Sequence, residues 1–304
     1  MSISAAMVRD LREKTSAGMM DCKKALEETK GDFEAAVEWL RKKGLASAAK
    51  KADRLASEGI VSAFVNSGKT GAVIEVNSET DFVAKNELFK QFVSNMAKYI
   101  ATSPSAPADV PALLETVIDG IKVGETLKES IAKIGENLVI RRFARFDSPG
   151  FVHCYVHGDG KIGVLVELST AQSSDQIKTF ANDVCLHAAA MSPISLSMED
   201  VPAEIVAKER EILIGKNIEQ GKKPEMIEKI VEGQIKKFLA ESCLLEQAFV
   251  KNPDIKVKDY MKETGKKIGE ELTIKRFVRF ELGEGLQKRS TDFAAEVAAQ
   301  TKAH

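Results

Sequence analysis

The sequence predicts an α+β protein that is built from several small modules. Three observations indicate this class: helical periodicity runs through residues 1–54, alternating strand patterns begin after residue 57, and one strand-containing unit occurs twice. The chain has 304 residues, of which 44% are hydrophobic and 29% charged, as is ordinary for a globular protein. This length allows about two or three domains with a buried core.

The first 54 residues are expected to form a three-helix domain with a linker. Apolar residues at helical spacing predict helices at 4–14 and 20–29 and a third that begins after Asp32, a good N-cap residue. Gly44 is expected to mark the end of the third helix. Residues 45–57 then form a linker or an exposed helix. So few residues make a marginal core, which favours a small docking module.

Residues 55–148 are predicted to form the first of two core subdomains. The turn-rich segment 66–71 lies between two strand-like segments, which is typical of a hairpin. A helix is expected from Phe89 to Ile100, because apolar residues recur there at helical spacing. The proline-rich segment 103–111 is expected to be a loop.

A second copy of this unit follows. The segment Ile134–Asp147 recurs as Ile268–Glu281, with nine of fourteen positions identical. The preceding hairpin recurs as well, so we interpret residues 149–281 as a second core subdomain with the same hairpin, helix and strand. The final strands of the two copies are expected from Leu138 and Leu272.

The second copy contains an insertion of 46 residues relative to the first. It lies at about 196–250 and is predicted to be an antiparallel coiled-coil hairpin of helices 203–219 and 224–240. Gly221 suits the position after the first helix, and Pro224 suits the first position of the second. The apolar residues expected to face one another are Ile205, Ile212, Leu213, Ile227, Val231, Ile235 and Phe238.

Two glycine motifs and one histidine pair raise the question of a cofactor or metal. Gly158–Gly163 matches the GxGxxG pattern of dinucleotide sites, and Gly68–Thr70 resembles the end of a phosphate-binding loop. Both sites require a helix immediately afterwards, whereas strands are expected here. His153, Cys154 and His157 share a predicted strand, but no third and fourth ligand cluster accompanies them. The sequence therefore predicts no cofactor and no metal.

Charge, cysteine usage and hydropathy exclude further classes. The 44 basic and 45 acidic residues give a net charge of −1, which argues against a main role in gripping nucleic acid. The four cysteines are widely spaced and form no CxxC motif, which fits a reduced cytoplasm. No apolar stretch is long enough for a transmembrane helix, and the first residues lack a targeting pattern. No nucleophile motif is present, so no catalytic residue is predicted.

Two apolar groups lie where a partner could reach them. Thr80–Val83 follows a strand and precedes a helix, so it is expected to be a loop. For Phe82, the residues alone favour packing against the local core over exposure as a wedge for a partner. Met19 and Met20 stand at a helix start, where methionines usually join the core and sometimes form an adaptable contact surface.

Two long motifs resemble those of the bacterial elongation factor Ts family. They are Glu75–Lys85 (EVNSETDFVAK) and Leu11–Leu26 (LREKTSAGMMDCKKAL), and both are far more specific than a glycine pattern. The resemblance covers essentially the whole chain, including Ile134–Asn137, the helical hairpin and the segment 291–297. It implies a ubiquitin-associated-like (UBA-like) N-terminal domain, a two-part α+β core, a coiled-coil hairpin and a C-terminal helical module at 282–304.

The resemblance also implies a function. Members of this family are guanine-nucleotide exchange factors, not enzymes, and they bind the GTPase elongation factor Tu in its GDP-bound and nucleotide-free forms. They promote GDP release and GTP rebinding during translation elongation in the cytoplasm. No membrane and no direct nucleic-acid contact is needed, and the helical hairpin offers a route to a higher-order assembly.

The site residues follow from the same resemblance. Carried over by position, Thr80, Asp81, Phe82 and Val83 would enter the nucleotide domain of elongation factor Tu and dislocate its Mg²⁺. The second Thr-Asp-Phe, at 291–293, lacks the surrounding motif, and no wedge role is expected for it. Further partner contacts are implied for Met19, Met20, Lys23, Ile134, Gly135, His157 and Gly158.

Two rival functions start from parts of the chain. An RNA-binding protein is suggested by Lys50 and Lys51 and by the arginine-rich segments Arg141–Arg145 and Lys275–Arg279, although the balanced net charge weighs against it. A ubiquitin-like adaptor is suggested by the three-helix module alone.

Overall fold

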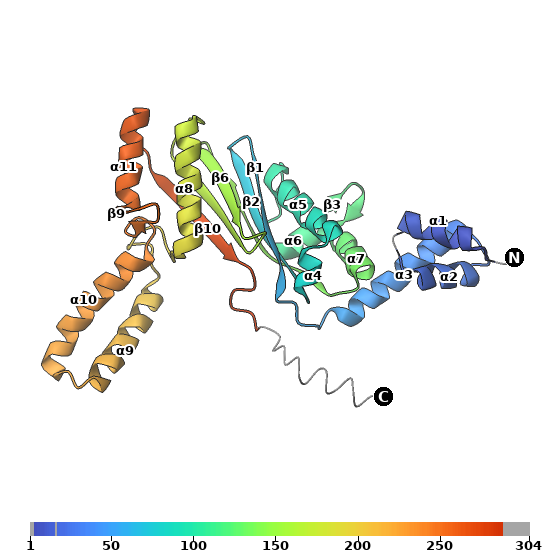
Figure 1. The fold of residues 1–304 in the computed structure, drawn as a ribbon, viewed down its shortest axis with the longest axis horizontal. Helices are drawn as coiled ribbons and strands as arrows, with labels where there is room; N and C mark the ends of the chain where they lie inside the picture. The colour runs from blue at the N-terminus through green and yellow to red at the C-terminus, as the bar shows by residue number, and fades with distance from the viewer. Residues whose placement is uncertain (1–2, 16, 288–304) are drawn as a thin grey trace. The chain divides into compact units, whose positions relative to one another are not determined.

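The computed structural model describes residues 3–15 and 17–287 (Figure 1). Helices and strands are mixed along this part of the chain, as expected for an α+β protein. The chain divides into two compact units, which are described separately. The described residues of unit 1 fall within 1–62, 74–143 and 281–287, and those of unit 2 within 63–73 and 144–280.

Unit 1 begins with the three predicted helices, α1 (Ala5–Thr15), α2 (Met19–Glu28) and α3 (Phe33–Lys51). Asp32 caps α3, because its carboxylate accepts a hydrogen bond from the backbone N–H of Ala35 at 2.9 Å. The helices share a small core, formed by Val8, Leu11, Cys22, Ala25, Leu26 and Ala36.

The third helix does not end at Gly44, contrary to the expectation from the sequence. It continues to Lys51, so most of the expected linker is helical. Gly44 lies where α3 packs against α7 (Val123–Ile134), and a Cβ atom at Gly44 would lie 2.9 Å from the Cβ of Ala132. Glycine is therefore present because two helices approach closely, rather than because a helix ends.

Two three-stranded sheets have the same pattern of pairing. In each sheet the second strand of a hairpin is central and pairs with a strand much later in the sequence, giving the orders β1–β2–β5 and β10–β7–β6. The last strand begins at Ile274 rather than at Leu272. The strands are β1 (Glu58–Asn66), β2 (Thr70–Ser78), β5 (Leu138–Asp147), β6 (Phe151–His157), β7 (Ile162–Leu168) and β10 (Ile274–Glu281).

Helix α5 (Glu87–Thr102) supplies much of the core of unit 1. Its N-cap, Asn86, accepts a hydrogen bond from Leu88 N at 2.9 Å. The predicted loop at 103–111 is shorter than expected, because α6 (Val110–Glu115) begins inside it, with Pro111 in its first turn. The small strands β3 (Val117–Ile118) and β4 (Ile121–Lys122) and helix α7 then lead to β5.

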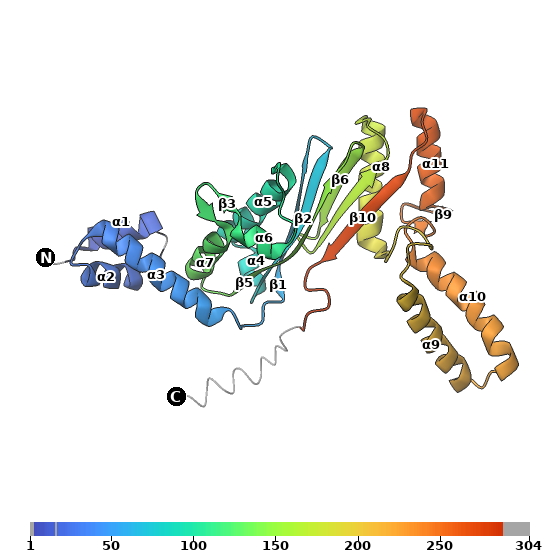
Figure 2. The ribbon, with the colours of Figure 1, turned by 180° about the vertical axis from the view of Figure 1, so that it is seen from behind.

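Unit 2 is organised around the antiparallel hairpin of β6 and β7, in register from Phe151 opposite Leu168 to His157 opposite Ile162. Helix α8 (Asp175–Met191) packs against these two strands (Figures 1 and 2). The later elements of unit 2 are β8 (Ala248–Phe249), β9 (Asn252–Lys256) and α11 (Val257–Ile268).

The insertion in unit 2 is a helical hairpin of α9 (Ala203–Glu219) and α10 (Pro224–Ser242), which lie side by side (Figures 1 and 2). Gly221 has a positive φ of 69° after α9. Ile205 and Ile212 are exposed, contrary to expectation, because the face of α9 that meets α10 lies one residue further along. The seam consists of Ile227, Val231, Ile235, Val206, Leu213 and Leu239.

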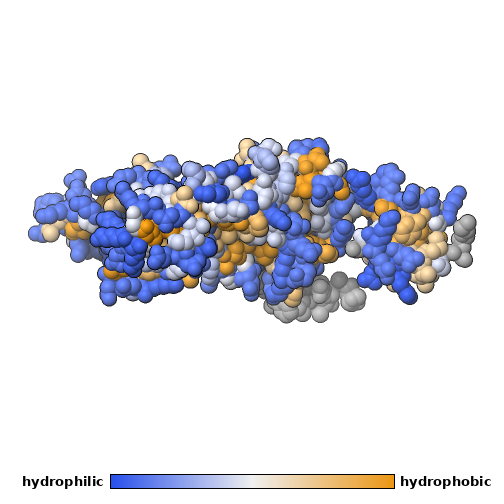
Figure 3. Space-filling model, turned by 90° about the horizontal axis from the view of Figure 1, so that it is seen from above, coloured by the Kyte–Doolittle hydropathy of each residue, from blue (hydrophilic) through white to orange (hydrophobic). Residues whose placement is uncertain are grey.

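The face of the described part that Figure 3 displays is mainly hydrophilic, with smaller hydrophobic areas. Among the described residues, no helix has both the length and the apolar character needed to cross a membrane. Of the expected C-terminal helical module, residues 282–285 form turns, and residues 288–304 lie outside the described residues.

Candidate functional site

A turn at residues 79–84, in unit 1, carries a large apolar side chain into solvent. It contains the single-turn helix α4 (Asp81–Ala84), where the sequence predicted a loop. The side chain of Phe82 is 77% exposed, so the expectation that it packs against the core is wrong. Its neighbour Val83 is only 7% exposed and anchors the turn in the core. The turn thus offers Phe82 to solvent while Val83 holds it down.

The two charged neighbours of Phe82 interact with each other. The Lys85 ammonium lies 3.2 Å from the Asp81 carboxylate and 5.7 Å from the centroid of the Phe82 ring. Both charged side chains are more than half exposed, so this ion pair contributes little to stability. Asp81 and Lys85 therefore remain available to another charged group.

A carboxylate far away in the sequence holds the turn. Glu136 accepts hydrogen bonds from the Thr80 backbone N–H at 3.0 Å and from the Thr80 hydroxyl at 2.7 Å. In the opposite direction, the Glu79 carboxylate accepts a hydrogen bond from the Asn137 backbone N–H at 2.7 Å. The segments 79–80 and 136–137 thus bind each other through two reciprocal contacts between a side chain and the backbone.

Ile134 and Gly135 lie immediately before this contact. Ile134 ends helix α7, and Gly135 is its C-cap with a left-handed φ of 89°. Glycine adopts this conformation without the steric cost of a Cβ atom. The helix end therefore brings Ile134 and Gly135 into the same region of unit 1 as the 79–84 turn, as the bond between Glu136 and Thr80 shows.

Asn137 connects this region to the end of the N-terminal domain. Its side chain is buried and donates hydrogen bonds to the carbonyl oxygens of Ala52 at 3.2 Å and Arg54 at 2.8 Å. The Arg54 guanidinium in turn lies 3.4 Å from the Glu79 carboxylate. The segment that follows α3 is thereby attached to the two segments that carry the turn.

The other expected contact residues lie elsewhere. Met19 and Met20, at the start of α2, are 50% and 74% exposed, and exposed Lys23 pairs with Glu27. His157 and Gly158 lie at the exposed end of β6 in unit 2. The expected site residues therefore form three groups. The first, at 80–83 and 134–135, is brought together by the hydrogen bonds between Thr80 and Glu136.

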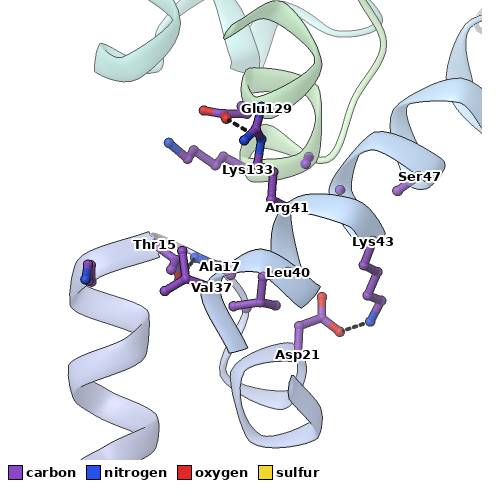
Figure 4. Close-up of a pocket in the computed structure, with 14 residues that line it drawn as sticks. Thr15, Ala17, Asp21, Val37, Leu40, Arg41, Lys43, Ser47, Glu129 and Lys133 are labelled. Atoms are coloured by element: carbon purple, nitrogen blue, oxygen red, sulfur yellow. Dashed lines mark hydrogen bonds and ion pairs between the residues drawn. The ribbon is translucent and has the colours of Figure 1, made fainter. Parts of the chain in front are cut away.

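A cavity of about 270 Å³ lies beside α2 and is lined by residues from the α1–α2 connection, α3 and α7 (Figure 4). Its charged walls are largely engaged in ion pairs. Lys43 pairs with Asp21, and Arg41 lies 3.9 Å from Glu129. The arrangement fixes α3 against its neighbours and provides no set of metal ligands.

The motifs that suggested a cofactor or metal have structural explanations. Strand β7 follows the glycines of the β6–β7 turn, so no helix N-terminus is available there for a pyrophosphate. Burial lowers the pKa of His153 and raises the pKa of Cys154 to about 11, as for side chains packed inside a sheet layer. No group of three metal-ligating side chains occurs among residues 3–15 and 17–287.

The arginines that suggested RNA binding are occupied within the chain. Arg141 and Arg142 lie 2.9 and 2.7 Å from the buried carboxylate of Glu75. Arg276 forms the corresponding pair with Glu167, at 2.6 Å. These side chains stabilise the two sheets and present a reduced surface to a phosphate backbone.

Comparison with known proteins identifies the family. A protein-family model described as elongation factor Ts matches residues 79–284. An elongation factor Ts from Bdellovibrio bacteriovorus is 57% identical over 310 residues, which span all of both chains. The elongation factor Ts of Syntrophotalea carbinolica is 51% identical over 99% of this chain and 100% of its own length. The chain belongs to the elongation factor Ts family. It is therefore a translation elongation factor, active in protein biosynthesis.

The elongation factor Ts motif identified Phe82 as a contact residue. It did not identify the residues that hold the turn on which Phe82 lies. Glu79, Glu136 and Asn137 were part of matched motifs, yet no role followed from them. The available signal was the repeat that contains Ile134–Asn137, since it marked these residues as part of a recurring segment. Nothing in the repeat linked that segment to Thr80. The expected contribution of 288–304 lies outside the described residues.

Proposed function

We propose that this chain is a guanine-nucleotide exchange factor that binds the GDP complex of elongation factor Tu and promotes GDP release and GTP rebinding. Family membership supports this proposal over the whole chain length. The full-length match also weighs against an adaptor function based on the three-helix domain alone.

One observation carries the proposal: Phe82 is 77% exposed at the tip of a turn that is held from both sides. Single exposed apolar side chains are common on protein surfaces, so exposure alone does not indicate a partner. It supports one here because Phe82 lies within Glu75–Lys85, the segment that resembles the family motif. The turn is tied down by Glu136 and Glu79, so Phe82 is presented in a defined place rather than on a floppy loop.

The exchange factor needs no catalytic side chain of its own. If it binds the nucleotide-free GTPase more tightly than the GDP form, thermodynamic reciprocity requires that it weakens GDP binding by the same factor. An acceleration of about 10⁴-fold corresponds to about 5.5 kcal/mol. Burial of one phenylalanine supplies roughly 2–3 kcal/mol. Phe82 therefore acts together with other contacts, for which we propose Ile134, Gly135, Met19, Met20, Lys23, His157 and Gly158.

Asp81 gives the turn a second way to weaken GDP binding by the partner. Its exposed carboxylate lies next to Phe82 and would enter the partner with it. We propose that it disturbs the Mg²⁺ site of elongation factor Tu by competing for hydrogen-bond donors there. Loss of Mg²⁺ removes the charge that neutralises the nucleotide phosphates, so GDP binds less tightly. Thr80 and Val83 support the same turn from within the chain.

The module plan forms part of the proposal. We assign a UBA-like domain to residues 1–54, core subdomains to 55–148 and 149–281, and a C-terminal module to 282–304. The equal strand orders of the two sheets support a duplicated core, and the seam of α9 and α10 supports a coiled-coil hairpin that could join copies of the complex. We also propose a cytoplasmic location, in keeping with a role in protein synthesis.

The decisive experiment measures release of a fluorescent GDP analogue from elongation factor Tu at fixed Mg²⁺. Substoichiometric amounts of the intact chain are expected to accelerate release. Phe82→Ala is expected to slow the accelerated rate roughly 30- to 160-fold, because about 2–3 kcal/mol of burial is lost. Val117→Ala is the matched control, since Val117 is also an exposed apolar residue, at 56%.

Two results would contradict the proposal at different levels. No acceleration by the intact chain, when chelation of Mg²⁺ does release the analogue, would exclude exchange activity. Normal acceleration by Phe82→Ala would retain the activity but reject the role of the phenylalanine. In the first case RNA binding would be tested next, through its dependence on salt concentration.

A further inference from the structure

We propose that Glu136 is a positioning residue for exchange: its carboxylate holds Thr80 and thereby fixes the turn that presents Phe82. This inference rests on the proposed function. It also changes the role of Thr80, which the family motif placed among the partner contacts. The geometry assigns Thr80 to an internal bond instead.

The hydrogen bonds of Thr80 carry the first step. Thr80 is the N-cap of α4, where a threonine oxygen ordinarily accepts a hydrogen bond from the first turn of the helix. No such cap bond is present at Thr80. Its hydroxyl donates to Glu136 Oε1 at 2.7 Å, and its backbone N–H donates to Glu136 Oε2 at 3.0 Å. Both donors of Thr80 are thus used on a single distant carboxylate.

The burial of the neighbouring residues carries the second step. Val83 and Asn137 are buried on either side of the contact, and the Glu79 side chain is 10% exposed. Glu136 is half-buried, so its bonds are partly shielded from water. Without it, the turn must be ordered when the partner binds, and each residue ordered costs roughly 1–2 kcal/mol. Glu136 removes part of that cost in advance.

The internal repeat provides a natural comparison. Glu270 occupies the position of Glu136 in the second copy, after Gly269, whose φ of 76° resembles the 89° of Gly135. Glu270 is exposed, and at the corresponding strand end Ser169 instead exchanges hydrogen bonds with Thr273. The turn therefore forms without its carboxylate being used. The bonds made by Glu136 accordingly serve the 79–84 turn.

The test compares exchange rates of full-length variants at saturating concentration. Glu136→Ala is expected to lower the maximal rate of GDP-analogue release about 10-fold. This corresponds to losing part of the free energy of two charge-assisted hydrogen bonds. Glu136→Gln is expected to recover much of the rate, because its amide oxygen still accepts a bond from Thr80. Glu270→Ala is the matched control and is expected to behave like the unmodified chain.

A double-mutant cycle separates positioning from general stability. If Glu136 acts through Phe82, Glu136→Ala should slow exchange less than about twofold when Phe82→Ala is already present. A full 10-fold loss in that background would overturn the proposal, since it would mean an effect independent of the phenylalanine. Thermal unfolding of each variant, followed by circular dichroism, identifies any that fail to fold. Glu136→Gln keeps the test valid if Glu136→Ala is one of them.

The outcomes distinguish this inference from the function on which it rests. Normal exchange by Glu136→Ala, combined with slow exchange by Phe82→Ala, would overturn only the positioning role. Normal exchange by Phe82→Ala would overturn the role of Phe82 and this inference with it, while the exchange activity would stand; only a lack of acceleration by the intact chain would overturn that activity. Slow exchange by both single variants, recovery in Glu136→Gln and no additivity in the double variant would support it.

Discussion

The Phe82 ring is exposed beside the ion pair of Asp81 and Lys85. A cation about 6 Å from a ring contributes roughly 0.5–1 kcal/mol at an exposed site, and an exposed ion pair contributes less. These interactions are strong enough to bias the side chains and weak enough to be exchanged for contacts with another protein. The stronger hydrogen bonds of the turn are made by Thr80, the residue before Asp81.

At the same scale, His187 is locked in one neutral form. It is fully buried on α8. Its Nε2 lies 2.9 Å from Gln247 Oε1, while its Nδ1 accepts a hydrogen bond from the Val250 N–H at 3.1 Å. The Gln247 amide is oriented by the carbonyl oxygens of Met191 and Glu241. Nε2 therefore carries the proton, and protonation of Nδ1 would direct an N–H at another N–H.

This network predicts that stability falls in mild acid. Burial lowers the pKa of His187, although its bond to Gln247 partly offsets the effect. A histidine whose folded-state pKa is depressed contributes stability above its ordinary pKa of about 6.5, and that stability is lost as pH falls. The free energy of unfolding should decrease between pH 7.5 and 5.5, by up to about 1.4 kcal/mol per pH unit for one proton. Thermal unfolding at several pH values measures this slope.

A variant isolates the contribution of His187. His187→Phe should be less stable at pH 7.5, because Val250 N–H and Gln247 Oε1 lose their partner. It should nevertheless show a smaller pH slope. His153 retains a slope of the same sign, since burial also lowers its pKa. An unchanged slope in the variant would show that His187 does not titrate as described.

At the scale of elements, the contact between α3 and α7 depends on Gly44. Gly44→Ala should loosen this contact, because the new Cβ atom would lie 2.9 Å from Ala132 Cβ, which is fixed to its own helix. Hydrogen exchange of the α3 amides should become faster. Gly233→Ala in α10 is the control: nothing lies within 4 Å of its Cβ position, so it should stabilise its helix by up to about 1 kcal/mol. Equal stabilisation by both variants would contradict the close approach at Gly44.

The helices of the N-terminal domain, α5 and the helical hairpin were predictable because their apolar residues recur over several turns. The strands β3 and β4 were not, since two residues cannot show a period. Helix α7 was missed because the recognised repeat begins only at Ile134, its last residue. The exposure of Phe82 was predicted wrongly from the residues alone, since the turn that carries it is bound through Thr80 to Glu136, 56 positions away in the sequence.

At the scale of the whole molecule, unit 1 contains contacts between residues that lie far apart in the sequence. The buried Glu75 carboxylate accepts hydrogen bonds from Arg141, Arg142 and the Gly283 backbone N–H. Burial raises the pKa of Glu75, but the Gly283 N–H and the two guanidinium groups outweigh it, so the pKa lies below its usual value. The charge is therefore retained, and the segment after β10 is fixed to β2.

Removal of this carboxylate should release that segment. Glu75→Ala is expected to cost about 3 kcal/mol of stability, since two arginines lose a buried partner. The Gly283 amide, which donates to Glu75 at 2.8 Å, should exchange with solvent much faster. Glu167→Ala is the matched control, because Glu167 pairs with Arg276 in unit 2. It should leave the exchange of Gly283 unchanged; protection of Gly283 in Glu75→Ala would contradict the clamp.

The hydrogen bond between Glu75 and Gly283 also has a consequence for folding during synthesis on the ribosome. Its two ends are 208 positions apart, and a ribosome adds about 5–20 residues per second, so the glutamate waits roughly 10–40 s for its partner to be made. Until Gly283 is made, the Glu75 carboxylate and the two arginines of the nascent chain lack the backbone N–H that completes their cluster. Unit 2 has all its residues before unit 1 does, although unit 1 contains the first residue of the chain.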